Sequence, residues 1–258
     1  MKKYIDLHCH PFLEYFQNPE EIINQAHQKG VEHFFLVGTD LNNCQEAIKL
    51  AQKFSFTYPV IGIHPNDAWN LDLVDKLAKL VDESVVGIGE IGLDYHYDNA
   101  PDQELQLKIF QAQVDLANQH HLPVIVHSRD AHEDTYQFIK DYKKNHPEQD
   151  FILHSYSSGV EYVQKYVDLG VYFSFSGVVT FKNAKATQEA CKLVPLDLIF
   201  CETDVPYLAP TPYRGQVNLP EYVIETTNFI ANLKEVSVEK LLEQLHQNML
   251  KVFKKIDN

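Results

Sequence analysis

Eight short apolar segments alternate along this chain with longer amphipathic stretches, and this alternation limits the folds available to it. Most of the short segments are apolar throughout, as strands buried on both faces are. The segments are Tyr4–His8, His33–Val37, Pro59–Ile63, Val85–Glu90, Pro123–His127, Phe151–His154, Val171–Ser174 and Leu198–Glu202. Strands that alternate with helices favour the α/β class with a parallel sheet.

The longer stretches carry the signals of helices. Asn18 stands at a helix N-cap, Pro19 follows in the first turn, and Gly30 marks the end. The predicted helices are Pro19–Lys29, Asn43–Phe54, Leu71–Val81, Gln103–Gln119, Ala131–Asn145, Val160–Leu169, Ala184–Leu193, Glu221–Leu233 and Val238–Lys254. Eight strand–helix units in 258 residues predict one domain, 1–258, folded as a TIM (β/α)8 barrel with parallel strands. An open doubly wound sheet is the alternative, although no GxGxxG turn follows the first strand.

Residues of metal-ligand type gather at the carboxyl ends of these predicted strands. They are His8, His10, His64, Glu90, His127, His154, Glu202 and Asp204. In a closed barrel all these ends meet at one rim, which is where the active sites of that fold lie. An open sheet would instead spread them along an edge.

This set of residues predicts a metal centre. A lone His-x-His pair such as His8 and His10 is a weak signal, but matching residues at four other strand ends strengthen it. Imidazole and carboxylate ligands suit Zn, Mn or Mg. The proposed ligands are His8, His10, Glu90, His127, His154 and Asp204. They exceed the needs of one tetrahedral ion, so we expect two divalent ions, with a carboxylate as the bridge.

Other polar residues near the rim have alternative interpretations. Asp204 is interpreted as a ligand, as the proton acceptor for an attacking water, or as both. Glu202 supports a ligand or is a buried structural acid. His64 contacts a substrate oxygen or is a half-buried structural histidine. Arg129 binds phosphate or forms a surface ion pair with a neighbouring acid, and Arg214 lies in a Pro-rich loop that suits substrate contacts.

Composition excludes several classes of protein. The formal net charge of −14 argues against metal-free binding along a duplex, although bound cations can reverse the local field. The sequence contains neither an apolar run long enough to span a membrane nor the apolar centre of a signal peptide. The four cysteines form no CxxC pair and are expected to be reduced and mostly buried. We therefore expect a cytoplasmic enzyme with no membrane association and no obligate protein partner.

The ordered motifs of the chain resemble the TatD family of metal-dependent deoxyribonucleases, within the amidohydrolase-like barrels. The resemblance runs from Asp6 to near Phe253. It rests on Asp6-Leu-His8-Cys-His10, Gly62-Ile-His64-Pro65, Gly89-Glu90-Ile-Gly92-Leu-Asp94-Tyr95, Pro123-Val-Ile-Val-His127-Ser-Arg129-Asp130-Ala131, His154-Ser155-Tyr156, Ser174-Phe-Ser176-Gly177, Glu202-Thr203-Asp204-Val-Pro206-Tyr207-Leu208 and Arg214-Gly215. The block that starts at His154 has an additional residue before Gly159, which bears on pocket shape.

The resemblance implies a role for each matching residue. His8, His10, Glu90 and Asp204 would hold one ion. Glu90, His127 and His154 would hold the second, which makes Glu90 the bridge. Catalysis would involve Asp204, Glu90 and His64, and substrate contacts would come from His64 and Arg129, with Arg214 as a further contact proposed from its loop. The activity implied is metal-dependent hydrolysis of DNA, often exonucleolytic, on single strands or ends.

Two further hypotheses stay open at this stage. The same metal centre suits hydrolysis of an ester or amide bond, including removal of D-amino acids from tRNA, because an activated water attacks carbon as well as phosphorus. The third hypothesis is a metal-binding scaffold without turnover. Sequence alone does not separate the first two, and the complete ligand set disfavours the third.

Overall fold

The computed structural model describes residues 3–256, which form eight strands with helices between them. The strands are β1 (Tyr4–Cys9), β2 (Val31–Val37), β3 (Thr57–Ile61), β4 (Gly87–Asp94), β5 (Val124–Arg129), β6 (Phe151–Leu153), β7 (Tyr172–Phe175) and β8 (Ile199–Cys201). The helices are α1 (Pro19–Gln28), α2 (Leu41–Ala51), α3 (Asp72–Ala78), α4 (Gln103–Gln119), α5 (His132–Asn145), α6 (Val163–Val167), α7 (Lys185–Leu193), α8 (Val223–Leu233) and α9 (Val238–Val252).

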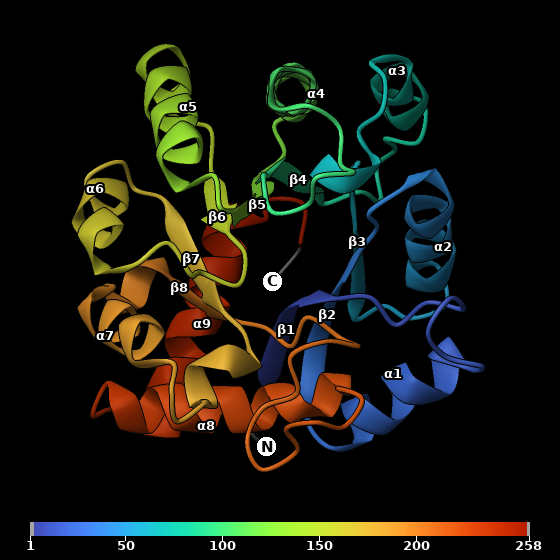
Figure 1. The fold of residues 1–258 in the computed structure, drawn as a ribbon. Coiled ribbons are helices and arrows are strands. Elements are labelled where there is room, and N and C mark those ends of the chain that lie inside the picture. The colour runs from blue at the N-terminus through green and yellow to red at the C-terminus, as the bar shows by residue number, and fades with distance from the viewer. Residues whose placement is uncertain (1–2, 257–258) are drawn as a thin grey trace.

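The strands form one parallel sheet in sequential order, from β1 to β8, and the helices lie in a ring around it (Figure 1). The sheet curls until its first and last strands meet. Cys9 pairs with Val205, and the Val205 carbonyl accepts a hydrogen bond from His10 N at 3.0 Å. Asp204 N donates to the His8 carbonyl at 2.8 Å. The prediction of a parallel (β/α)8 barrel is thus confirmed.

Local sequence explains where these elements begin and what they bury. Side chains at N-cap positions accept backbone N–H groups, and Asn18, Asp40, Asp102 and Ser237 do this for α1, α2, α4 and α9. Strands β1, β4 and β7 are buried along their whole length. Burial on both faces removes apolar surface from water on the barrel interior and beneath the helices, which stabilises the closed sheet.

Strand β4 is longer than predicted. The sequence placed its end at Glu90, but the strand continues to Asp94. In the pairing with β5, Ile88 opposes Val124 and Ile91 opposes Val126, so Gly89 and Glu90 share the place of one residue. Such a bulge redirects a side chain. Glu90 therefore lies within the strand, and Asp94 occupies its carboxyl end.

Two contacts hold this extension of β4. Gly92 has φ +144°, and a Cβ at this position would lie 2.0 Å from the His127 carbonyl oxygen. Only glycine allows β4 and β5 to approach so closely. Gln106 of α4 accepts a hydrogen bond from Asp94 N at 2.8 Å and donates to the Asp94 carbonyl at 2.9 Å. The helix thereby fixes the end of the strand.

The four cysteines are free and buried, as expected from the sequence.

Among residues 3–256, no helix combines the length and the apolar character needed to cross a membrane. Helix α6 is shorter than the predicted Val160–Leu169, because residues 160–162 form a 3-10 turn first.

We predict that Gly92→Ala destabilises the protein far more than Gly170→Ala. Both glycines have positive φ, but a Cβ at Gly170 meets nothing within 4 Å. Gly170→Ala is expected to cost about 1 kcal/mol of unfolding free energy from backbone strain, and Gly92→Ala more than about 3 kcal/mol because the strands must also separate. Urea denaturation of both variants tests this. Equal losses would contradict the close approach of β4 and β5.

Candidate metal centre

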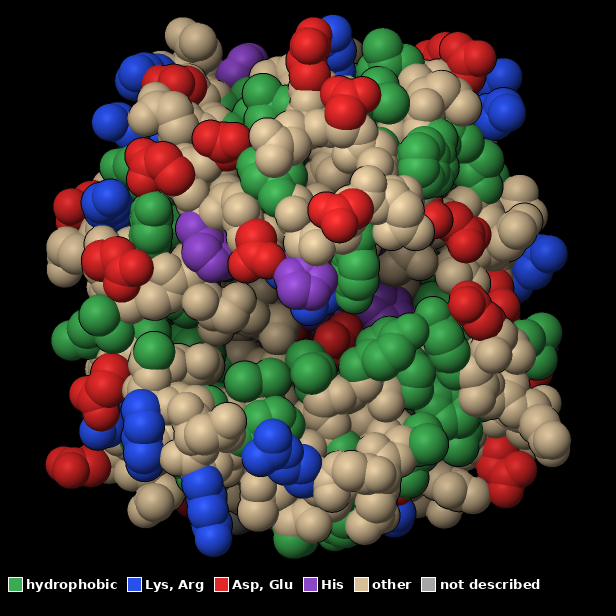
Figure 2. Space-filling view, viewed as in Figure 1, with side chains coloured by type: hydrophobic (Ala, Val, Ile, Leu, Met, Phe, Trp, Pro, Cys, Tyr) green, Lys and Arg blue, Asp and Glu red, His purple; other side chains and the backbone are tan. Residues whose placement is uncertain are grey.

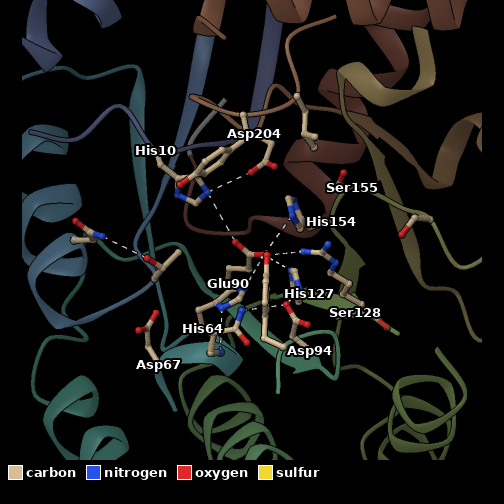
Figure 3. A pocket seen from close by; sticks show the side chains of 18 of the residues that line it. His10, His64, Asp67, Glu90, Asp94, His127, Ser128, His154, Ser155 and Asp204 are labelled. Atoms are coloured by element: carbon tan, nitrogen blue, oxygen red, sulfur yellow. Dashed lines mark hydrogen bonds and ion pairs between the residues drawn. The ribbon is translucent and has the colours of Figure 1, made fainter. Parts of the chain in front are cut away.

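A cavity of about 640 Å³ opens at the carboxyl ends of the strands. Figure 3 shows histidine and carboxylate side chains converging in it from several strands. The residues that line it include His10, Tyr15, His64, Asp67, Glu90, Asp94, Tyr97, His127, Arg129, His154, Asp204 and Tyr207. The barrel thus brings together residues that are up to 198 positions apart along the chain, from His10 to Leu208.

Glu90 lies at the centre of this cluster, and its two oxygens face different histidines. Oε2 lies 3.2 Å from His8 Nε2 and 3.9 Å from His10 Nε2. Oε1 lies 2.6 Å from His127 Nδ1 and 3.3 Å from His154 Nε2. A carboxylate that presents one oxygen to each of two groups of imidazoles has the geometry of a bridge between two cations.

Asp204 completes the group on the Oε2 side of the bridge. Its Oδ1 lies 3.4 Å from His10 Nε2 and 3.9 Å from His8 Nε2, while the two imidazole nitrogens are 3.1 Å apart. The hydrogen bond from Asp204 N to the His8 carbonyl, across the seam of the barrel, sets this position. One ligand atom each from His8, His10 and Asp204 falls within 4.8 Å of the others, as a shared cation requires.

Two of the histidines direct their remaining ring nitrogen at an oxygen. His10 Nδ1 lies 2.5 Å from the Val37 carbonyl, and His127 Nε2 lies 3.2 Å from Asp94 Oδ2. A carbonyl or carboxylate can only accept a hydrogen bond, so each of these nitrogens carries the proton. Their other nitrogens, His10 Nε2 and His127 Nδ1, face Asp204 and Glu90 in the cluster, so a cation bound there would take the place of a proton and receive their lone pairs.

His154 follows the same pattern through Glu202. Its Nδ1 lies 2.8 Å from Glu202 Oε1, which also accepts the backbone N–H of Ser155 at 2.8 Å. Glu202 is fully buried. Histidines that bind metals characteristically have such an oxygen partner on the second nitrogen, which fixes the tautomer and the ring orientation. The donors present therefore fit divalent cations.

The charges of the cluster agree with this fit. Burial alone would raise the pKa of Glu90, but His154, His127 and His8 hold it well below its usual range. Burial likewise opposes ionisation of Asp204, and contact with His10 keeps its pKa below the ordinary value. Within residues 3–256, all ion pairs of these two carboxylates are with histidines. Both carboxylates are thus ionised at neutral pH without a lysine or arginine partner.

His64 lies beside the cluster and is held in one tautomer. Its Nδ1 accepts a hydrogen bond from Asn66 N at 3.2 Å, so the proton resides on Nε2, which lies 3.7 Å from Glu90 Oε1. Burial, and next the charge of His127, lower the pKa of His64 to about 3. At neutral pH it therefore offers one neutral N–H donor to the cavity.

The two arginines singled out in the sequence occupy different places. Arg129 lines the cavity, where its Nη1 donates to the Tyr97 hydroxyl at 3.0 Å and its guanidinium lies 5.1 Å from the centre of that ring. Arg214 instead lies over the Phe181 ring at 4.3 Å and is not among the residues that line the cavity. The structure thus brings Arg129, but not Arg214, to the cavity.

Sequence reasoning assigned no role to Asp94. It took β4 to end at Glu90, and on that interpretation Asp94 falls in a loop. In the structure β4 extends to Asp94, and the Asp94 carboxylate lies within hydrogen-bond distance of His127. It also accepts hydrogen bonds from Asn66 Nδ2 at 3.1 Å and His96 N at 2.9 Å. Side chains four residues apart in an extended strand share one face, so a longer β4 would have placed Asp94 on the same face as Glu90.

We predict that Asp94→Asn weakens metal binding roughly 10- to 100-fold, because His127 loses the carboxylate that fixes its orientation. Asp67→Asn is the matched control, since Asp67 lines the same cavity but lies apart from the cluster (Figure 3). Competition with a chelator of known affinity measures the loss. Equal effects of the two variants would show that only the charge of the cavity matters.

Comparison with known proteins agrees with this geometry. Residues 5–254 match the family model described as TatD related DNase. Uncharacterized metal-dependent hydrolases of Mycoplasma genitalium and Bacillus subtilis are each 36% identical, over 97% and 96% of this chain and 99% and 98% of their own lengths. The solved structure of the Escherichia coli TatD homologue YjjV is 27% identical with a TM-score of 0.87, and covers 97% of this chain and 98% of its own. The chain therefore belongs to the TatD family of metal-dependent hydrolases.

Proposed function

We propose that this protein hydrolyses phosphodiester bonds of DNA, removing nucleotides from single strands or ends. The observation that carries the proposal is the placement of Glu90, whose two oxygens face separate groups of histidines. Paired cations on such a bridge stabilise both the attacking and the leaving oxygen of a phosphodiester, as two-metal nucleases do. The family description, TatD related DNase, supports the same substrate.

We further propose that the chain holds two divalent ions, Zn, Mn or Mg. His8, His10, Glu90 and Asp204 would hold one of them, while Glu90, His127 and His154 would hold the other. When bound, such ions polarise the phosphate and supply a nucleophile from water near neutral pH. The mixture of imidazoles and carboxylates suits each of the three metals.

The side chains of the cavity perform the remaining steps. Asp204, ionised and beside His10, accepts the proton that the attacking water loses. His64 donates its Nε2–H to a phosphate oxygen, and its neutral form at pH 7 keeps that donor available without a charge. Arg129 lines the cavity and offers a planar cation to a neighbouring phosphate.

The proposal also covers the setting of the enzyme. Every proposed ligand comes from one chain, so no protein partner is needed to complete the site. Four free, buried thiols are typical of a reducing cell interior, so we propose the cytoplasm as the location.

One prediction from this proposed function concerns metal content. The protein is expected to bind two divalent ions, and His10→Ala is expected to bind one, because His10 serves only the Oε2 side of the bridge. His120→Ala, which replaces an exposed histidine at the end of α4, is the control and is expected to keep both ions. Metal analysis after dialysis gives the count. A single ion in the unaltered protein would contradict the two-metal proposal.

The second prediction concerns activity. With Mg, Mn or Zn, the protein is expected to shorten labelled single-stranded DNA, and EDTA is expected to abolish the reaction. Asp204→Asn should lower kcat by at least roughly 10²–10⁴-fold, because the proposed proton acceptor is lost and a proposed metal ligand is weakened. Asp168→Asn, an exposed change at the end of α6, should leave kcat unchanged.

D-aminoacyl-tRNA is assayed in parallel with the DNA. Deacylation without DNA cleavage would replace the nuclease proposal by the ester hydrolase, and bound metal with neither activity would indicate a scaffold.

A further inference from the structure

Two tyrosines form an aromatic surface on one side of the metal cavity. Tyr15, from the segment after β1, and Tyr207, from the segment after β8, both line the cavity. Their ring centroids are 5.8 Å apart at an interplanar angle of 74°, and their hydroxyl oxygens are 3.2 Å apart. Tyr207 remains 52% exposed. This tyrosine pair therefore presents ring surface to the cavity and is not part of the hydrophobic core.

Short backbone contacts fix the tyrosine pair relative to the metal cluster. Tyr207 N donates to the Asp204 carbonyl at 2.8 Å, and the Tyr207 carbonyl accepts a hydrogen bond from the buried Asn218 side chain at 2.5 Å. Tyr15 N donates to the Phe12 carbonyl at 2.9 Å, one turn beyond His10. A group bound against the pair would therefore be held at a fixed place beside the metal cluster.

The charge of the cavity shows why a nucleic acid needs such a surface here. Asp67, Glu90, Asp94 and Asp204 line the cavity, and Arg129 is the only lysine or arginine among the lining residues. With a net charge of −14 for the chain, phosphate contacts alone hold a DNA strand poorly away from the cations. Further affinity is available from the faces of the bases, which stack on aromatic rings irrespective of sequence.

Most of the exposed large hydrophobic side chains lie at the end of the barrel where the cavity opens. Figure 2 shows hydrophobic side chains beside the central hollow that holds histidine and acidic side chains. The large exposed residues in segments that connect a strand to the following helix are Leu13, Trp69, Leu71, Tyr97, Val160, Tyr207 and Val217. Among the described residues, only Leu107 and Leu193 lie elsewhere, on helices. The cavity face is therefore the face that offers apolar contacts.

We propose that the Tyr15–Tyr207 pair binds the unpaired nucleobase next to the scissile phosphate, with the base stacked on the exposed Tyr207 ring, and so selects single-stranded ends. This proposal rests on the proposed function. In a duplex both faces of each internal base are covered by neighbouring bases, so such a base cannot reach the pair without unstacking. The cavity, at about 640 Å³, has the size of sites that enclose a small molecule, roughly 300–1,000 Å³, and suits one nucleotide.

The test compares intact and base-free substrates. Three thymidine hexanucleotides are used, one intact, one with a tetrahydrofuran abasic unit at its 5′ end and one with the unit at its 3′ end. The wild-type protein is expected to show a KM about 10-fold higher for one of the abasic substrates than for the intact one, because one stack is lost. Tyr207→Ala should raise KM by a similar factor for the intact substrate and leave KM for that abasic substrate unchanged.

Tyr207→Phe is the matched control, because it keeps the ring and removes the hydroxyl contact with Tyr15. It should retain the wild-type discrimination between substrates. Metal content is measured for both variants, because the backbone of Tyr207 is hydrogen bonded to that of Asp204. The metal content of each variant should equal that of the wild type. A second readout is the fluorescence of 2-aminopurine in place of the terminal base, which stacking quenches in the wild type and Tyr207→Phe but not in Tyr207→Ala.

The outcomes separate the two proposals. Equal KM values of the wild type for all three hexanucleotides would overturn the stacking proposal and leave the nuclease intact. An equal rise of KM for intact and abasic substrates in Tyr207→Ala would do the same. No cleavage of any hexanucleotide by the metal-loaded wild type would overturn the proposed function, and the stacking proposal with it.

Discussion

The Glu90 carboxylate, buried in the barrel between two groups of imidazoles, is the interaction on which the rest of the site depends. Each of its oxygens faces histidines from different strands, with β1 on one side and β5 and the end of β6 on the other. Burying an ionised carboxylate is costly unless it is paired, and here the partners are histidines rather than a lysine or an arginine. A cluster of this kind is stable when cations share the lone pairs of its members.

A second layer of oxygens orients this first layer. Asp94, Glu202 and the Val37 carbonyl each face the outer nitrogen of one histidine, so the inner nitrogens present lone pairs in fixed directions. The bulge at Gly89 and Glu90 belongs to the same arrangement, because it lets one strand supply both the central carboxylate and a supporting one. The geometry of the centre thus follows from the backbone of β4 as much as from the ligands themselves.

The sequence was sufficient to predict the barrel and the convergence of the six proposed ligands. Apolar segments of strand length alternate with amphipathic helices, and parallel strands in a closed barrel must bring their carboxyl ends to one rim. What it did not reveal depends on backbone detail. Asp94 was missed because a bulge and a close approach at Gly92 extend β4, and neither leaves a periodic signal. Arg214 and Tyr207 lie in one long loop, whose path decides which of them reaches the cavity.

The pairing of β1 with the segment after β8, which closes the barrel, has a consequence for folding during synthesis. His8 and His10 emerge from the ribosome early, whereas Asp204 follows almost two hundred residues later, and their meeting requires β1 to pair with the segment after β8. A partly made chain cannot assemble the centre, however many of its strands have already formed. The complete set of six proposed ligands therefore comes together only when the ring of strands closes.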